Sequence, residues 1–189
     1  MRLKDENKSE NIFNAAIQLI NEFGLAEISM SKIAKKANVS SSTIYVYFEN
    51  KEDMLNKLYL SVKEKMSRAV FDNFDDSTSF QSYETFLRKL ANFIFNNKDS
   101  FLFMEQFANS PLIHKLSRRE GREFFDPIRN LFEKGKKHNV FKKVDTDLLV
   151  IFTFDPMTKF GKEYFNGQAE WNQENLNNII QMSWDAVKA

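Results

Sequence analysis

The chain has 189 residues, of which 42% are hydrophobic and 28% charged, with five glycines and three prolines, and this balance excludes a disordered, collagen-like or membrane-embedded chain. Because 27 basic residues face 26 acidic ones, the net charge is +1, and any contact with nucleic acid must come from a local basic patch. The chain has no cysteine, which excludes disulfides, thiolate metal sites and a thiol nucleophile.

The start of the chain is charged where a secretory signal needs an apolar run, and no apolar stretch approaches the ~20 residues of a membrane span. We therefore expect a cytoplasmic protein with no membrane partner.

The first third of the chain predicts four helices. Residues 7–23 carry an apolar stripe with helical spacing at Ile12, Ala16, Leu19 and Phe23. This helix is expected to end at Gly24, which takes a left-handed conformation without a Cβ penalty. Ser29 and Ser40 are good N-caps for two short helices, through residue 37 and over residues 41–48. Asn50 caps a fourth, whose apolar stripe is Leu55, Leu58, Val62, Met66 and Ala69.

Residues 71–79 lose the period and gather turn formers, so we expect a loop between two halves of the chain. Helical spacing then returns over residues 80–94 and 101–108, from residue 124 to an end near residues 135–139, and over residues 148–165 and 176–187. Pro127 and Pro156 fall inside such patterns and predict helix starts or kinks. Because no alternating strand pattern competes, the fold class is expected to be all-α.

Residues 30–37 and 41–48 form two short helices joined by a tight turn, which is the form of a helix-turn-helix. Ala34 is small where the helices must cross, while Val39 and Ile44 fill the space between them. Asn38 lies where the chain reverses and is, after glycine, the residue most tolerant of positive φ.

In a helix-turn-helix, the N-terminal end of the second helix enters the major groove. Here that end carries hydroxyls followed by Tyr45 and Tyr47, with no arginine or lysine for bidentate reading of guanine. Hydroxyl hydrogen bonds and apolar contacts with thymine methyls remain. Positive charge lies outside this helix, on Lys32, Lys35, Lys36 and Lys51. Taken alone, these lysines are equally explained as a solvated surface and the serines as helix caps. The complete helix-turn-helix pattern favours DNA binding.

Five stretches together, residues 12–16, 23–24, 29–34, 37–40 and 43–55, resemble the DNA-binding domain of the tetracycline-repressor-like (TetR/AcrR) family of bacterial transcriptional regulators. Two positions depart from the family pattern. Asn38 replaces the usual turn glycine, and Val46 stands where an aromatic residue is common and removes one possible backbone contact.

The resemblance implies a domain at residues 8–55, with its helix-turn-helix at about 29–48, a connecting helix at 56–72, and an all-helical ligand-binding and dimerisation domain at 75–187. It implies a homodimer that binds a palindromic double-stranded operator on the nucleoid, acts as a repressor and is released by a small effector. The aromatic residues of the second half lead us to expect an apolar or aromatic effector. The residues it places at DNA are Ser31, Ser41, Ser42, Thr43, Tyr45, Tyr47 and Lys51, and the positive charge of Lys32 adds that residue to the expected DNA contacts.

Phenylalanine distinguishes the second half of the chain, since only Phe13, Phe23 and Phe48 of the 20 precede residue 70. An apolar effector pocket is expected from Phe86, Phe93, Phe103, Phe107, Phe124, Phe125 and Phe152, and a packed core is the alternative for each. The dimer interface is expected on the last two helices, at Leu148, Phe152, Leu176, Ile180 and Trp184.

No enzyme site is expected, because the chain lacks a glycine-rich phosphate loop and a nucleophile with its base. His114 and His138 have no carboxylate partner at ligand spacing, so neither a metal nor a cofactor is predicted. The alternative function is a helical protein-interaction module without sequence-specific DNA binding.

Overall fold

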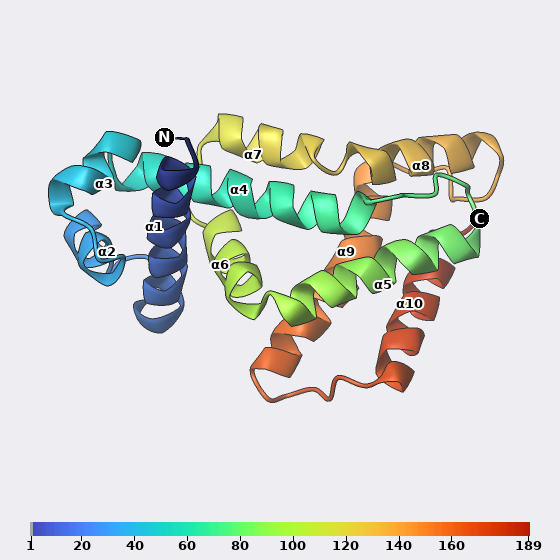
Figure 1. The fold of residues 1–189 in the computed structure, drawn as a ribbon. Coiled ribbons are helices and arrows are strands. Elements are labelled where there is room, and N and C mark those ends of the chain that lie inside the picture. The colour runs from blue at the N-terminus through green and yellow to red at the C-terminus, as the bar shows by residue number, and fades with distance from the viewer. Residues whose placement is uncertain (1) are drawn as a thin grey trace. The chain divides into compact units, whose positions relative to one another are not determined.

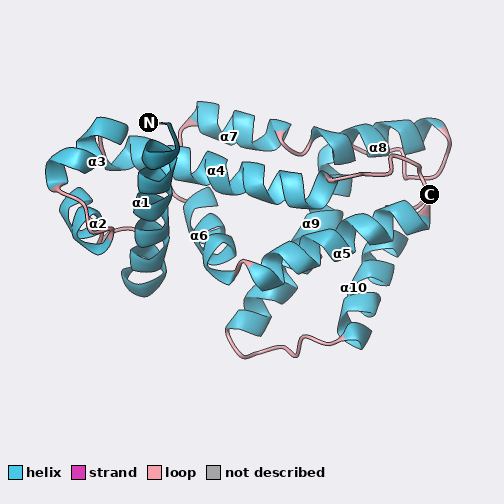
Figure 2. Ribbon diagram, viewed as in Figure 1, coloured by secondary structure: helices cyan, strands magenta, loops and turns pink. Residues whose placement is uncertain are grey.

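The computed structural model describes residues 2–189, and within that range the chain forms ten α-helices (Figures 1 and 2). The bounds are α1 Arg2–Phe23, α2 Met30–Lys36, α3 Ser41–Tyr47, α4 Lys51–Phe71, α5 Phe80–Asn96, α6 Lys98–Ala108, α7 Lys115–Glu123, α8 Asp126–Lys137, α9 Thr146–Phe165 and α10 Gln173–Val187. The all-α expectation is confirmed, and the one β-contact among the described residues is an isolated bridge between Phe141 and Lys188.

The helices divide into two compact units. The first contains residues up to 63 together with 99–121, and the second contains residues 64–98 and 122–189. The helix α4 therefore begins in the first unit and ends in the second. The helix α6 and most of α7 pack with the first unit, although residues 99–121 lie within the stretch expected to form the regulatory domain.

The core of the first unit is apolar and fully enclosed at Ile12, Ala16 and Ile20 of α1, Ile33 of α2 and Ile44 of α3. Gly24 ends α1 with φ +80°, and its N–H donates to the carbonyl of Ile20 at 2.8 Å, as expected for a C-terminal glycine. Phe23, expected on the buried stripe, is instead 54% exposed, because the stripe closes one turn earlier, at Leu19 and Ile20.

Asn56 joins α4 to the segment between α6 and α7 inside the first unit. Its side chain is 4% exposed, and its amide nitrogen donates to the carbonyls of Glu52 and Leu112 at 2.9 and 3.0 Å. Its oxygen accepts the N–H of His114 at 2.8 Å. Both ends of this buried amide are thus satisfied, which is the condition for burying a polar group at little cost.

The second unit is built around α9, which packs against α5, α8 and α10. Its core is aromatic: Tyr83, Phe86, Phe132 and Phe141 are all fully buried. Pro127 lies in the first turn of α8, where its missing N–H costs nothing, and Pro156 lies inside α9. On the α4 stripe, Val70 is buried and Ala69 is exposed, so the last expected position is wrong by one residue.

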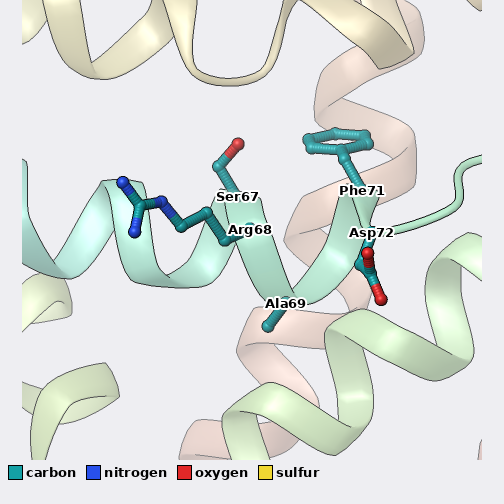
Figure 3. Close-up of a pocket in the computed structure, with 5 residues that line it drawn as sticks. All are labelled: Ser67, Arg68, Ala69, Phe71 and Asp72. Carbon is teal, nitrogen blue, oxygen red and sulfur yellow. The ribbon is translucent and has the colours of Figure 1, made fainter.

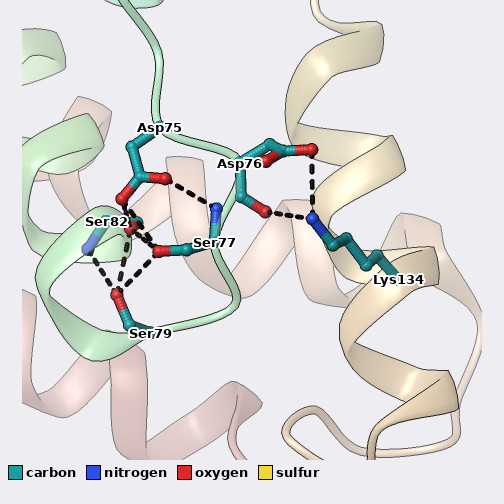
Figure 4. A network of polar contacts seen from close by, with 6 residues as sticks. All are labelled: Asp75, Asp76, Ser77, Ser79, Ser82 and Lys134. Atoms are coloured by element: carbon teal, nitrogen blue, oxygen red, sulfur yellow. Dashed lines mark hydrogen bonds and ion pairs between the residues drawn. The ribbon is translucent and has the colours of Figure 1, made fainter.

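The loop between α4 and α5 is held by short polar contacts (Figure 4). The carboxylate of Asp75 accepts the hydroxyls of Ser82 and Ser77 at 2.6 and 2.8 Å and the N–H of Ser77 at 2.9 Å, and these bonds lower its pKa. Ser79 caps α5 by accepting the N–H of Ser82 at 3.1 Å. From α8, the Lys134 ammonium donates to the Asp76 carboxylate at 3.1 Å, so the loop is bonded to both α5 and α8.

Candidate nucleic-acid interface

The helices α2 and α3 meet in the tight turn that the sequence predicts. Asn38 has φ +54°, and the N–H of Val39 donates to the carbonyl of Ala34 at 3.0 Å. Ala34 is 1% exposed and Ile44 is fully buried, so the crossing is close-packed. The turn fixes the direction in which α3 presents its outer face.

The N-terminus of α3 is a cluster of hydroxyls centred on Ser40. Its Oγ accepts the N–H of Thr43 at 3.1 Å and lies 2.8 Å from the Ser42 Oγ and 2.7 Å from the Thr43 Oγ1. Ser41 and Ser42 are exposed, and Thr43 is half-buried. Because hydroxyls both donate and accept, this end of α3 can match either kind of group on a base edge or a phosphate.

Two side chains project furthest from α3. Tyr45 is 56% exposed and Val46 is 80% exposed. Tyr47, expected to be exposed, is half-buried, with its ring centroid 6.2 Å from that of Phe48. From the sequence, Val46 is expected only to remove one possible contact with the DNA backbone. Its helical position four residues after Ser42, on the hydroxyl-bearing side, is the signal that identifies it as part of the outer face.

Two of the four expected basic residues, Lys32 and Lys51, are bonded to the chain itself, and Lys35 and Lys36 are exposed. The ammonium of Lys32 donates to the carbonyl of Glu27 at 2.7 Å, and Ser31 Oγ lies 3.0 Å from the Oγ of the α2 cap, Ser29. The ammonium of Lys51 donates to the carbonyls of Leu25 and Ile28, each at 2.8 Å. Burial lowers the pKa of Lys51, and the negative charge of Glu27 opposes the shift. Lys51 thus braces the start of α4 against the loop before α2.

The phenylalanines expected to line an effector pocket do not gather in one unit. Phe103 and Phe107 stack on each other in the first unit, with ring centroids 5.6 Å apart, whereas the other five lie in the second. Within the second unit Phe86, Phe93 and Phe125 are buried and Phe124 is half-buried, while Phe152 is 53% exposed and points away from the core.

A hollow of about 690 Å³ lies beside the last turns of α4 in the second unit (Figure 3). It is lined by Ser67, Arg68, Ala69, Phe71 and Asp72, and includes none of the predicted pocket residues. The Ser67 hydroxyl donates to the carbonyl of Phe124 at 2.7 Å, and the Phe71 ring contacts Phe86 and Phe125. The walls of the hollow are therefore part aromatic and part charged.

The residues expected at a dimer interface separate into exposed and buried groups. Leu148 and Phe152 are 47% and 53% exposed on α9. On α10, Leu176 and Ile180 are buried within the protomer, at 6% and 1% exposed. Trp184 packs on Tyr83 and Phe141. The sequence missed two exposed apolar neighbours, Ile151 on α9 and Met182 on α10.

Neither metal-ligand clusters nor membrane spans occur in the part of the chain that the structure describes. No group of three or more metal-ligating side chains forms among those residues, and His114 contacts Glu52 through its Nε2 at 2.8 Å. No helix there is long and apolar enough to cross a membrane.

Comparison with known proteins identifies the family. Residues 12–58 match the model of bacterial regulatory proteins of the tetR family, and residues 79–188 match the model of the tetracyclin repressor-like C-terminal domain. An uncharacterized HTH-type transcriptional regulator of Haemophilus influenzae is 24% identical over the full length of both chains. A TetR family transcription regulator from Marinobacter aquaeolei superposes with a TM-score of 0.92 at 25% identity, covering 100% of this chain and 99% of that one.

A further solved structure, the transcriptional regulator FadR of Bacillus subtilis in complex with stearoyl-CoA, has the same fold, with a TM-score of 0.73 at 20% identity over 92% of this chain and 96% of that one. Both family models match this chain, one over the helix-turn-helix and the other over most of the second helical unit. The chain therefore belongs to the tetracycline-repressor (TetR) family of helix-turn-helix transcriptional regulators.

Proposed function

We propose that the protein is a ligand-responsive repressor that binds a palindromic operator as a homodimer in the bacterial cytoplasm. The outer face of α3 is the observation that carries this proposal, because capped hydroxyls, Tyr45 and Val46 project together from a rigid helix-turn-helix. Packing within the chain does not explain why a valine on this helix is 80% exposed.

Base reading in this proposal relies on hydroxyls and apolar contact. The helix α3 has no arginine or lysine, so the commonest reading of guanine is absent from it. Ser41, Ser42 and Thr43 supply hydrogen bonds to base edges or phosphates, and the Val46 methyls pack on thymine methyls. The operator half-site is accordingly expected to present thymines toward α3.

In this proposal, the contacts with the phosphate backbone of DNA come from Tyr45, Tyr47, Ser31, Lys32 and the start of α4. Lys51 uses two of its three ammonium hydrogens on carbonyls, and it lies at a helix N-terminus, where backbone N–H groups and the dipole favour an anion. A phosphate bound there completes the ammonium's third bond.

The proposed homodimer uses the exposed apolar side chains of α9 and α10. Leu148, Ile151 and Phe152 follow each other at helical spacing on one face of α9, and Met182 is 71% exposed on α10. One short recognition helix buries too little surface for specific affinity, and two copies about one helical turn apart on a palindrome restore it.

The proposed effector is a mostly apolar small molecule. The aromatic content of the second half of the chain and the partly aromatic hollow beside Phe71 support this class. The stearoyl-CoA bound to the Bacillus subtilis neighbour supports a long acyl chain as the first compound to test. To act as an inducer, it must favour the DNA-incompetent state by ~1–3 kcal/mol.

Mobility shifts on genomic fragments at a series of salt concentrations test the DNA-binding function. Lys51→Ala is expected to weaken binding to all sequences and to reduce the slope of log K against log salt by about one, because one phosphate contact is lost. Lys143→Ala, a change of an exposed lysine in the second unit, is the control. Loss of thermal stability with an unaltered slope would show that Lys51 is a brace alone.

A further inference from the structure

Pro156 leaves one backbone carbonyl inside α9 without its helical donor. In an α-helix the carbonyl of residue i accepts the N–H of residue i+4, and the position four residues after Phe152 is proline, which has no N–H. A carbonyl that loses its helical donor at a part-buried position carries a penalty, which a donor from a neighbouring element relieves.

Ser183 of α10 supplies that donor. Its hydroxyl oxygen lies 2.7 Å from the Phe152 carbonyl oxygen, and the residue is 2% exposed. Because a serine hydroxyl has one hydrogen and this hydrogen is given to the carbonyl, the Ser183 oxygen can only accept from any further partner.

Tyr83 of α5 is that partner. Its hydroxyl lies 2.6 Å from the Ser183 oxygen and 3.1 Å from the Thr153 oxygen. Thr153 gives its own hydrogen to the Leu149 carbonyl at 2.7 Å, so it too can only accept. The chain of donors therefore runs in one direction, from Tyr83 through Ser183 to the carbonyl of Phe152, and joins α5, α10 and α9.

We propose that Ser183 and Tyr83 are positioning residues that lock α10 against α9 at the carbonyl freed by Pro156. The hydroxyls of Tyr83 and Ser183 and the carbonyl of Phe152 are called here the proline latch, and two of these residues supply or adjoin exposed apolar side chains. Phe152 supplies both the accepting carbonyl and an exposed ring, and Met182 precedes Ser183 in the chain. The latch therefore sets how these two side chains stand relative to each other.

A double-mutant cycle on the full chain tests the latch directly. Ser183→Ala is expected to lower the melting temperature by roughly 3–8 °C, because the Phe152 carbonyl loses its hydroxyl donor at a part-buried position. In the Pro156→Ala background, residue 156 regains an N–H for that carbonyl, so the same change is expected to lower the melting temperature by less than half as much. Equal losses in both backgrounds would overturn the proposal.

Thr153→Val is the matched control. It removes a second buried hydroxyl beside Tyr83, but the Leu149 carbonyl keeps the helical N–H of residue 153, so the effect is expected to be equal with Pro156 or Ala at 156. Protein concentration is held constant throughout, since a dimer's melting temperature depends on it.

A second cycle does not depend on the proline variant. Tyr83→Phe is expected to lower the melting temperature in the wild-type chain and to have a smaller effect in the Ser183→Ala background, where the oxygen that accepts its hydrogen is gone. Additive losses would contradict the proposed chain of donors.

The effect of the latch on self-association rests on the proposed homodimer and is measured separately. Sedimentation equilibrium is expected to show weaker dimerisation for Ser183→Ala and recovery in the Pro156→Ala, Ser183→Ala double variant. A wild-type chain that is monomeric would refute the proposed homodimer while leaving the melting cycles to decide the latch. A dimer of unchanged affinity in Ser183→Ala would refute its positioning role.

Discussion

Val46 is the most exposed of the large apolar side chains described for this chain, and its contribution to DNA reading can be separated from that of the hydroxyls around it. Val46→Ala is expected to cost ~1 kcal/mol of operator affinity, at the low end of the range for a base-edge contact. Replacing the contacted thymine by uracil removes the methyl group alone. If the contact is real, the cost of Val46→Ala disappears on the uracil operator.

The control for this measurement is Val144→Ala, since Val144 is also an exposed valine, 42% accessible, but lies in the second unit. It is expected to leave operator affinity unchanged on both DNAs. Fluorescence anisotropy with labelled duplexes measures the affinity of each of the two variants for the thymine and the uracil operator, relative to the wild type. A Val46→Ala penalty of the same size on thymine and uracil operators would assign the valine to some other role.

Two ionisable groups with shifted pKa values, Lys63 and Tyr83, predict how folding stability changes at alkaline pH. Burial lowers the pKa of Lys63 to about 8 from 10.5, against the opposing charge of Glu105. Burial raises the pKa of Tyr83 to about 12 from 10.0. Between pH 8 and 10 the unfolded chain keeps a proton on Lys63 that the folded chain has lost, so raising the pH favours folding.

Above pH 10 the unfolded chain loses the Tyr83 proton while the folded chain retains it, so the stability from that group falls toward pH 12. Stability is therefore expected to rise by up to about 3 kcal/mol on the Lys63 limb and then to fall. Urea unfolding at each pH measures the curve. Lys63→Met is expected to remove the rise and Tyr83→Phe the fall; a rise that persists in Lys63→Met would assign it to another group.

At the level of single residues, the sequence predicts local backbone structure better than hydrogen bonds between residues far apart in the chain. It predicted the caps Ser29 and Ser40 and the positive φ of Asn38, because these depend on a few neighbouring residues. It did not predict that Lys51 would be bonded to two carbonyls, since that depends on where the loop carrying Leu25 and Ile28 returns to α4.

Among the elements, α8 depends on the absence of a side chain at Gly135. A Cβ at that position would lie 2.2 Å from Cδ2 of Phe141, which is fully buried. The Phe141 ring has little room to move, because its centroid is 5.0 Å from that of Phe132 and 5.6 Å from that of Trp184. The close approach lets the chain after α8 fold back across the helix.

Gly135→Ala is therefore expected to destabilise the protein by ~1–3 kcal/mol, even though alanine is the better helix former by about 1 kcal/mol. Chemical denaturation measures the change. Adding Phe141→Leu, which shortens the ring that the new methyl meets, is expected to recover part of the loss relative to Phe141→Leu alone. A Gly135→Ala variant more stable than the wild type would show that the ring yields easily.

Apolar periodicity identified most of the elements and failed at one. The helices α5, α9 and α10 follow stripes that are plain in the sequence, and their observed starts lie within three residues of the expected ones. The helix α7 was missed, because Lys115–Glu123 is a mostly charged segment with little apolar pattern. The pocket and interface residues also needed the fold, since one helical stripe does not tell which neighbour covers it.

For the molecule as a whole, the exposed fraction of each apolar side chain on α9 and α10 decides which substitutions can test the proposed dimer. Ile151→Glu and Met182→Glu place charge on side chains that are 46% and 71% exposed, so the protomer is expected to stay folded while the dimer dissociates and operator affinity falls. Light scattering and circular dichroism report these two properties separately. A dimer of unchanged mass in both variants would move the interface elsewhere.

The controls are Lys143→Glu and Leu176→Glu. Lys143 is exposed, so its change is expected to leave mass and helicity unaltered. Leu176 is 6% exposed inside the protomer, so its change is expected to reduce helicity and melting temperature, whatever the oligomeric state.

The discontinuous first unit constrains the construction of hybrid regulators. Residues 99–121 belong to the same compact unit as α1, α2 and α3, and the buried amide of Asn56 makes one of its donor bonds and its acceptor bond with the backbone of Leu112 and His114. A graft that joins residues up to 63 to a foreign effector domain removes both partners and leaves a buried amide unsatisfied. A transferable specificity module from this protein therefore consists of two chain segments, and a single junction in α4 divides it.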